Sequence, residues 1–143
     1  FRIIIISMTF LNKYINKLRN SGLRPTKQRI RICEVLFDTE NTFHFSVDEL
    51  TKKIQTKSDK KISVATVYNT VHAFEKKGYL KQIHINSNKT YFDTNVTDHH
   101  HFYDTESEEL IDLDNKDVGP IKIQKTIPGK KIKSVEVLVK LED

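Results

Sequence analysis

Residues 63–95, SVATVYNTVHAFEKKGYLKQIHINSNKTYFDTN, combine one helical pattern with two strand patterns. Ser63 can cap a helix that Gly78 ends. The apolar residues between them recur at helical spacing, which predicts a helix over 64–77 whose inward face is made of Val64, Val67, Val71 and Phe74. The runs YLKQIHI and KTYFDTN flank the polar break at 86–88, which predicts a two-stranded hairpin.

Three further helices are expected before this stretch. Residues 9–20 carry apolar side chains at helical spacing, Thr26 can cap a second helix, and Ser46 with Glu49 forms the capping box of a third. Short helices followed by a hairpin make the winged-helix arrangement, a variant of the helix-turn-helix. The sequence therefore predicts a winged-helix DNA-binding domain over residues 9–94.

Residues 95–143 are expected to form a second, β-rich domain. HHHFYD and EELIDLD look like strands, PIKIQKTI fits either a helix or a strand, and KIKSVEVLVKLE alternates like a strand. One face of that last strand is expected to carry Val135, Val137, Val139 and Leu141. A unit of about 45 residues buries little apolar surface alone, so we expect it to form a homodimer. The predicted class is α+β, with an N-terminal winged-helix domain and a small C-terminal α/β dimerisation domain.

The first residues, FRIIIIS, form an apolar run too short to span a bilayer or to act as a signal peptide. Met8 follows directly, so residues 1–8 are expected to be a non-native or disordered extension. No association with a membrane is expected. The single cysteine, Cys33, excludes a disulfide framework and a structural zinc site of four cysteines within one chain, and it favours a cytoplasmic location.

Charge is unevenly distributed along the chain. Residues 1–94 contain 17 Lys and Arg against 8 Asp and Glu, a net charge of +9. Residues 95–143 contain 7 against 11, a net charge of −4. The basic first part suits a polyanion, although lysine-rich solvated surfaces are common.

The outer face of the last predicted helix has the properties of a recognition helix. Its small residues allow entry into the major groove, where Tyr68 can pack on a thymine methyl group and Asn69 can pair with an adenine edge. Arg24, Arg29 and Lys89 are placed to hold phosphates or to enter an A·T-rich minor groove. An ordinary amphipathic helix has a polar outer face too, and the hairpin and the basic charge favour DNA. The predicted DNA-binding residues are Arg24, Thr26, Arg29, Ala65, Thr66, Tyr68, Asn69 and Lys89.

The run TDHHHFYD, residues 97–104, holds three of the six histidines. In an extended segment His99 and His101 point the same way and His100 points the other way. A His-x-His pair is a good start for a first-row divalent metal site, which carboxylates complete. With acids from the hairpin end and the next strand, and one histidine from the first domain, the predicted ligands are His44, Asp93, His99, His101 and Asp112. Each of these residues could instead be an ordinary loop, turn or surface residue that binds no metal.

The motifs GLRPTKQR, SVDEL, SVATVYNT and TYFDTN, followed by the histidine cluster, resemble the ferric uptake regulator family over residues 10–141. The run YFDTN-x-x-DHHHFY without a cysteine pair is most similar to the iron response regulator branch. The resemblance implies a homodimeric transcriptional regulator, not an enzyme, that controls iron and haem metabolism genes from an A·T-rich operator. It implies one divalent ion per subunit, Fe²⁺, Mn²⁺ or Zn²⁺, with haem as a further candidate ligand.

This chain departs from the family pattern in several places. Asp104 and Ser107 stand where many members have a zinc-binding Cys-x-x-Cys, so that zinc is not expected. Glu34 follows Cys33, so the Cys-Pro haem motif of some relatives is missing. The residues left for haem or a partial second metal site are His100, Asp98 and Glu142. Asn69 replaces a basic residue of other branches, which indicates a different operator.

Two other functions compete for the same residues. One is a constitutive winged-helix DNA-binding protein whose histidines only solvate a loop. The other is a metal-dependent hydrolase, which needs an open coordination position and a substrate cleft. The hydrolase is disfavoured because the chain has no general-base motif, no glycine-rich loop and no nucleophile near a histidine.

Overall fold

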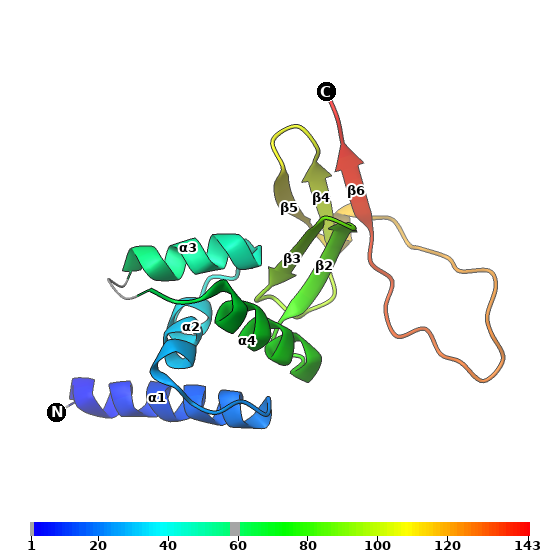
Figure 1. Cartoon of the computed structure of the whole chain (residues 1–143). Helices are drawn as coiled ribbons and strands as arrows, with labels where there is room; N and C mark the ends of the chain where they lie inside the picture. The colour runs from blue at the N-terminus through cyan, green and yellow to red at the C-terminus, as the bar shows by residue number, and fades with distance from the viewer. Residues whose placement is uncertain (1, 58–60) are drawn as a thin grey trace. The chain divides into compact units, whose positions relative to one another are not determined.

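The computed structural model of the chain describes residues 2–57 and 61–143, with side chains from Met8 onward. It divides into two units, Phe1–Val96 and Thr97–Asp143. The first is mainly helical and the second is a small sheet, which confirms the predicted α+β class (Figure 1). The division lies two residues beyond the boundary expected from the sequence.

The first unit has the predicted order of helices and hairpin. Its elements are α1 (Arg2–Asn20), α2 (Lys27–Phe37), β1 (His44–Phe45), α3 (Val47–Lys57), α4 (Val64–Lys77), β2 (Lys81–Asn86) and β3 (Lys89–Asp93). The strands form one antiparallel sheet in the order β1-β3-β2. Strand β1 is an addition to the prediction, which placed no strand before the hairpin; its His44 pairs with Asp93.

Helix α1 begins at Arg2, earlier than the sequence predicts. Phe1 of the predicted extension lies outside the described residues, whereas residues 2–8 have helical backbone. The disordered alternative therefore does not hold for residues 2–8, whose backbone is helical, and the alternative that they are a non-native extension stays a prediction. In the described part of the chain, no helix has the length and apolar character needed to cross a membrane.

The predicted caps fix where the helices of the first unit begin and end. Thr26 accepts a hydrogen bond from the N–H of Arg29 at 3.2 Å. Ser46 and Glu49 bond reciprocally, with the Glu49 N–H on Ser46 Oγ at 3.1 Å and the Ser46 N–H on Glu49 Oε2 at 3.3 Å. Gly78 ends α4 with φ 88°, a left-handed conformation that glycine adopts without a steric cost. These local features confirm the predicted starts of α2 and α3 and the predicted end of α4.

Ser63→Ala tests the cap of α4. Ser63 Oγ accepts from the N–H of Thr66 at 3.1 Å, and losing that bond is expected to cost about 1 kcal/mol of unfolding free energy. Urea denaturation followed by circular dichroism measures the change. The control is Ser87→Ala in the exposed turn between β2 and β3, which should have no comparable effect. Equal destabilisation by both changes would contradict the capping role.

The core of the first unit gathers one face of every helix. Helix α4 contributes Val67, Val71 and Phe74, all fully buried. Val64 was predicted to join them, and that prediction is wrong because 49% of it is exposed. Ile62, one residue before the cap, is buried and fills the core beside the first turn, as in a hydrophobic staple. This leaves Val64 on the outer face of α4.

Cys33 lies in this core with no exposed surface. Burial raises the pKa of its thiol from the ordinary value of 9.0 to about 12. The buried, protonated thiol therefore makes its full contribution to the free energy of unfolding below pH 9.0. That contribution declines as the pH rises toward about 12, because in this range the thiol ionises only in the unfolded chain. We expect iodoacetamide to spare Cys33 in the native protein and to alkylate it rapidly in guanidinium. Equal rates in both states, measured by mass spectrometry, would contradict its burial.

The second unit is a three-stranded sheet. Its strands are β4 (His100–Asp104), β5 (Glu109–Leu113) and β6 (Leu138–Leu141), in the order β5-β4-β6. Strand β5 runs antiparallel and β6 parallel to β4. A short 3₁₀ turn, η1 (Asn115–Asp117), follows β5, and residues 97–143, all described, contain no α-helix.

Two predictions in this unit are corrected. PIKIQKTI, residues 120–127, forms neither a helix nor a strand. The last strand covers only Leu138–Leu141 of the predicted run, and Val135 and Leu141 are exposed. A strand is stabilised by its ladder of hydrogen bonds, so alternation alone makes no strand where the chain offers no neighbour.

Candidate functional site

Helix α4 presents a short-chained outer face at its amino end. Val64 and Tyr68 are 49% and 51% exposed, and Ala65 and Asn69 are exposed beside them. Thr66 is half-buried, and its hydroxyl pairs with that of Ser63 at 2.8 Å. Small residues here keep the helix end slim enough for the major groove. The structure thus brings four of the predicted DNA-contact residues onto one face and adds Val64 to it.

Tyr68 belongs to a chain of aromatic contacts between α4 and the hairpin. Its ring lies 4.1 Å from that of His72, and the His72 ring meets Phe92 of β3 edge-on at 5.5 Å. His72 is half-buried in this position between the helix and the hairpin. The contacts orient the exposed phenol of Tyr68 outward from α4.

An open hollow of about 400 Å³ lies where the amino ends of α2 and α4 meet. It is lined by Thr26, Lys27, Gln28, Arg29 and Thr66. Helix amino ends carry unpaired N–H groups and partial positive charge, which together with cationic side chains suit a phosphate.

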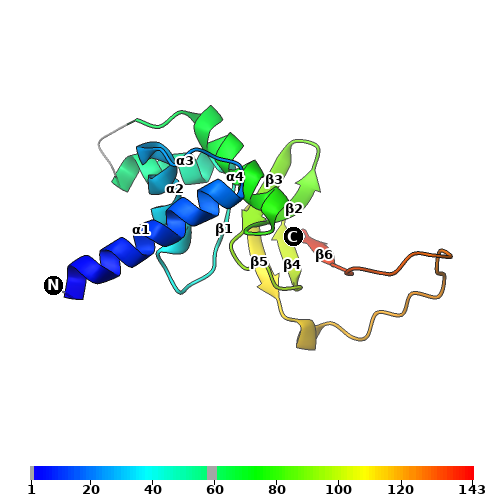
Figure 2. The same cartoon turned by 90° about the horizontal axis from the view of Figure 1, so that it is seen from below.

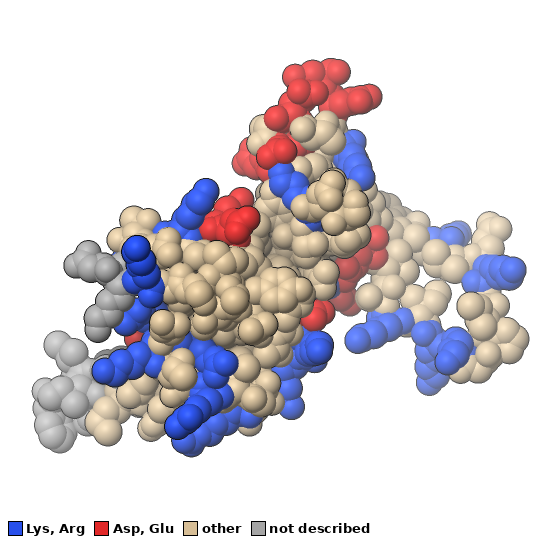
Figure 3. All heavy atoms as spheres, viewed as in Figure 1, with Lys and Arg blue, Asp and Glu red and all other residues tan. Residues whose placement is uncertain are grey.

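Other predicted phosphate contacts lie nearby or on the hairpin. The guanidinium of Arg29 donates to the carbonyl oxygen of Arg24 at 2.9 Å, which fixes its direction. Lys89 begins β3 and is half-buried. Figure 3 shows Lys and Arg side chains spread over the helical unit, in keeping with its positive charge. Direct contacts of Arg24, Thr26, Arg29 and Lys89 with DNA stay predictions.

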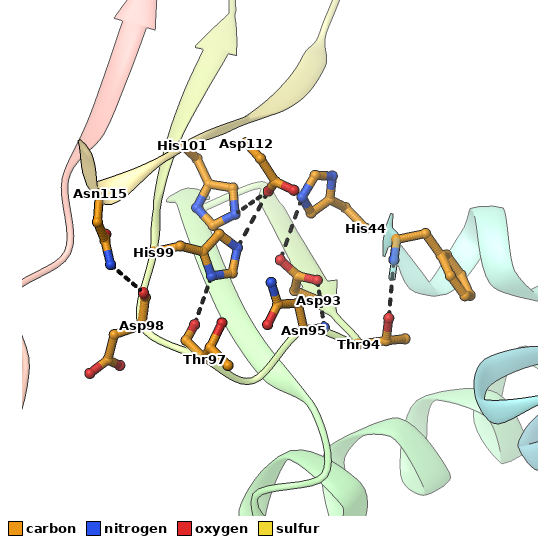
Figure 4. A network of polar contacts seen from close by, with 11 residues as sticks. His44, Asp93, Thr94, Asn95, Thr97, Asp98, His99, His101, Asp112 and Asn115 are labelled. Carbon is orange, nitrogen blue, oxygen red and sulfur yellow. Dashed lines mark hydrogen bonds and ion pairs between the residues drawn. The ribbon is translucent and has the colours of Figure 1, made fainter. Parts of the chain in front are cut away.

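In the second unit, three predicted metal ligands converge. Pairing of β4 with β5 sets His101 opposite Asp112, and His99 precedes β4 on the same side (Figure 4). The Nε2 atoms of His99 and His101 each lie 3.3 Å from Asp112 Oδ1, and both histidines are buried. The two rings are 4.4 Å apart, as the predicted alternation requires.

The hydrogen bonding of His99 makes this cluster suited to a cation. Its Nδ1 lies 2.7 Å from the carbonyl oxygen of Thr97, which can only accept, so Nδ1 carries the proton. In the neutral ring the Nε2 lone pair then faces Asp112 Oδ1, and two acceptors meet at 3.3 Å. A metal ion or a second ring proton relieves that repulsion. A carbonyl behind a histidine that aims the opposite nitrogen is the usual support of a metal ligand.

The first unit holds a pair of possible metal donors of its own. Pairing of β1 with β3 sets His44 opposite Asp93, with His44 Nε2 3.4 Å from Asp93 Oδ2 (Figure 4). Asp93 is only 1% exposed, and its Oδ1 accepts from the N–H of Asn95 at 2.8 Å. A buried carboxylate needs a cationic partner to offset its desolvation. A protonated His44 or a metal ion can supply it.

His100 faces away from the cluster, as the alternation predicts. It is buried, and its Nδ1 accepts a hydrogen bond from the N–H of Val137 at 2.9 Å. Asp98 and Glu142, its predicted companions, are exposed, and the Asp98 carbonyl accepts from the Asn115 side chain at 3.0 Å. His100 thus has a structural role in the sheet, and a haem or second metal site at these residues stays a prediction.

Asp104 stabilises the turn that follows β4 through its side chain. Its Oδ1 accepts from the backbone N–H groups of Glu106 and Ser107 at 2.8 and 3.2 Å, which closes the turn between β4 and β5. These bonds lower the pKa of Asp104. The stabilisation that these bonds give to the turn is therefore fully present above the ordinary carboxyl pKa. It is lost as the pH falls through the lowered pKa of Asp104, where the carboxylate takes up a proton.

Sequence reasoning missed three residues of these surfaces. Val64 is on the recognition face, and Lys27 and Gln28 line the hollow at the helix ends. Their positions in the sequence could have identified all three residues. Each lies within two residues of a predicted cap, where side chains sit beside the unpaired N–H groups of the helix.

Comparison with known proteins identifies the family of this chain. A model of the ferric uptake regulator family matches residues 20–141. The ferric uptake regulation protein of Rhizobium leguminosarum bv. viciae is 32% identical over 113 residues, which cover 78% of this chain and 78% of the relative. The peroxide-responsive repressor PerR of Staphylococcus epidermidis is 30% identical over 103 residues, which cover 72% of this chain and 67% of the relative.

Solved structures show a similar fold. The Vibrio cholerae ferric uptake regulator superimposes with a TM-score of 0.67 at 21% identity, covering 90% of this chain and 98% of that chain. The Pseudomonas aeruginosa regulator, solved with manganese, gives a TM-score of 0.65 at 18% identity, covering 91% and 97%. The match of the family model over most of the chain and the 32% identity to a relative show that this chain belongs to the ferric uptake regulator family, a family of metal-responsive transcriptional regulators and not of enzymes.

Proposed function

We propose that this protein is a cytoplasmic, homodimeric regulator whose affinity for an A·T-rich operator in double-stranded DNA depends on one divalent metal ion per subunit. The observation that carries the proposal is the convergence of two buried histidines, His99 and His101, on the same oxygen of Asp112. The lone pairs of a neutral imidazole and a carboxylate repel each other when they face each other, and a cation between them turns that repulsion into attraction.

The proposed site draws its ligands from both units. His99, His101 and Asp112 offer three donor atoms within 4.8 Å of one another, and His44 with Asp93 offers two more. Such a mixture of nitrogen and oxygen donors suits Fe²⁺, Mn²⁺ and Zn²⁺. When bound, the ion would supply a positive charge that both sets of ligands share. His44 and Asp93 would then lose freedom relative to the second unit, and operator binding by a dimer depends on the placement of its two recognition helices.

Helix α4 is the proposed reading element. Tyr68 and Asn69 are exposed on its outer face, where they can contact base edges while the hollow at the helix ends holds a phosphate. Each module reads a short site, so a dimer with two copies of α4 gains length and specificity.

Operator binding with and without metal tests the proposal. Electrophoretic mobility shift with metal-free protein, then with Mn²⁺, Fe²⁺ or Zn²⁺ added, should show a change in operator affinity and a steep dependence on salt. Random DNA of equal length is the control. Unchanged affinity with every metal would favour a constitutive DNA-binding protein, and equal affinity for random DNA would reject sequence-specific regulation.

Control of iron and haem genes rests on the resemblance of residues 91–103 to the iron response regulator branch. We expect operator occupancy to differ between iron-rich and iron-poor growth, which footprinting measures. For haem, a Soret band that disappears when His99, His100 and His101 are all changed to alanine would support binding at the histidine run. An unaltered band would place haem elsewhere.

A further inference from the structure

Residues 118–137, here called the arm, leave the sheet of the second unit after η1 and return to it at β6. None of these residues lies in a helix or strand, and two perpendicular views show them reaching away from their own sheet (Figures 1 and 2). At the tip, the N–H of Lys130 donates to the Ile127 carbonyl at 3.0 Å, and Gly129 has φ 77°. Pro128 followed by Gly129 suits a type II turn, so the tip is a defined reversal of the chain.

Both roots of the arm are anchored. At the far root, the N–H of His101 donates to the Val137 carbonyl at 3.0 Å, and the N–H of Val137 donates to His100 Nδ1 at 2.9 Å. At the near root, Asn115 donates its side-chain amide to the Asp98 carbonyl at 3.0 Å. These bonds give the arm a defined point of departure from the sheet.

The arm exposes apolar side chains that its own unit does not cover. The exposed fractions are 42% for Ile121, 49% for Ile123, 67% for Ile127, 58% for Ile132 and 37% for Val135. Branched residues in extended chain suit a strand that is half-buried against another surface. Left bare, such a segment invites aggregation, so a partner surface is expected.

Charge indicates what that surface is. The arm carries five lysines and one glutamate, a net charge of +4, while residues 97–117 carry eight acids and one lysine, a net charge of −7. Figure 3 shows acidic side chains gathered at the end of the sheet that holds the β4–β5 turn and the end of β6, and basic ones along the arm. The acids at this turn that are exposed are Glu106, Glu108 and Glu109. Strand β5 has only β4 as a neighbour among the strands of residues 97–143, so its other edge can accept an extended segment.

We propose that the arm of one subunit docks on the acidic β4–β5 side of a second copy, with its isoleucines against the sheet and its lysines beside Glu106, Glu108 and Glu109. Two-fold symmetry makes the exchange reciprocal, because each copy donates one arm and receives one. The inference rests on the proposed homodimer and names the segment that forms it. DNA is a less suitable partner for the arm, because it would contact the lysines and leave the isoleucines exposed to solvent.

The apolar contact is tested by Ile121→Ser, Ile123→Ser and Ile127→Ser combined in the full chain. The dimer dissociation constant from sedimentation equilibrium should rise by about 10-fold or more for each isoleucine lost, because apolar burial on the partner is removed. The matched control is Leu11→Ser, a residue of α1 that is 43% exposed, which should leave dimerisation unchanged. Thermal unfolding monitored by circular dichroism checks that the variants fold.

Charge exchange between subunits gives a second test. One variant carries Lys130→Glu, Lys131→Glu and Lys133→Glu, and the other carries Glu106→Lys, Glu108→Lys and Glu109→Lys. Each should dimerise weakly alone, and an equimolar mixture should form the heterodimer, since the contact between the two changed segments then joins opposite charges. If the changed residues only stabilised the fold of their own chain, mixing the two variants would not restore dimer formation.

Three results would overturn the inference. One is a triple isoleucine variant that dimerises as tightly as the wild type. Another is mixing that restores nothing. The third is arm variants that remain dimeric and lose operator affinity, which would assign the arm to DNA. A wild-type protein that is monomeric at all concentrations would instead reject the proposed homodimer itself, so the two failures are distinguishable.

Discussion

His101→Ala is expected to abolish the effect of Mn²⁺ on operator binding and to lower metal affinity by more than about 100-fold. Loss of a residue that merely supports a ligand already costs about 10–100-fold, and His101 is itself a proposed ligand. Its Nε2 lies 3.3 Å from Asp112 Oδ1, and β4 holds its backbone in the sheet. Metal titration by calorimetry and operator binding with and without Mn²⁺ measure the two effects.

His84→Ala is the matched control for this change. His84 is an exposed histidine of β2, so its loss removes an imidazole without touching the cluster. Circular dichroism of the metal-free proteins separates loss of the ligand from loss of the fold. A His101→Ala protein that binds Mn²⁺ like the wild type would remove His101 from the site, even if other members of the set remained.

Asn69→Ala is expected to weaken operator binding by about 1–3 kcal/mol and to relax the preference at one base pair. Asn69 is exposed on α4 beside Tyr68, whose ring contacts His72. A side-chain amide can bond an adenine edge through two atoms at once, and alanine can make neither bond. Selection from a randomised operator library shows which position loses its preference.

Two comparisons show whether Asn69 reads bases. Asn41→Ala removes an exposed amide from the segment between α2 and β1 and should leave the operator affinity unchanged. Arg29→Ala should weaken binding to all sequences alike and reduce the salt slope by about 1, as expected for a phosphate contact. A uniform loss with Asn69→Ala, without a change of preference, would assign that residue to the backbone instead.

Local chemistry made most of the first unit predictable. The caps at Thr26, Ser46 and Ser63 and the stop at Gly78 act within a few residues, so their side chains define helix ends without reference to the rest of the chain. Val64 shows where periodicity fails, since it has helical spacing and still lies outside. Ile62, just before the cap, is buried in the core at the helix start instead, and the apolar repeat within the helix does not predict this.

The second unit was predictable only where its strands pair within the chain. His101 and Asp112 were expected on neighbouring strands and are paired across β4 and β5. Residues 120–127, which fit either a helix or a strand, and residues 131–137, which alternate like a strand, form no strand, because strand formation needs a neighbour at hydrogen-bonding distance.

The sequence by itself determined the family, the capped ends of α2, α3 and α4 and the alternation that separates His99 and His101 from His100, because these follow from residue type and short-range spacing. Only the tertiary structure decided that both Nε2 atoms of the pair aim at one Asp112 oxygen, that His44 is in a strand opposite Asp93, and that the arm leaves its isoleucines bare. Each of these depends on strand register and packing between segments far apart in the chain. Such long-range pairing is set by the fold as a whole, which no single stretch of the sequence encodes.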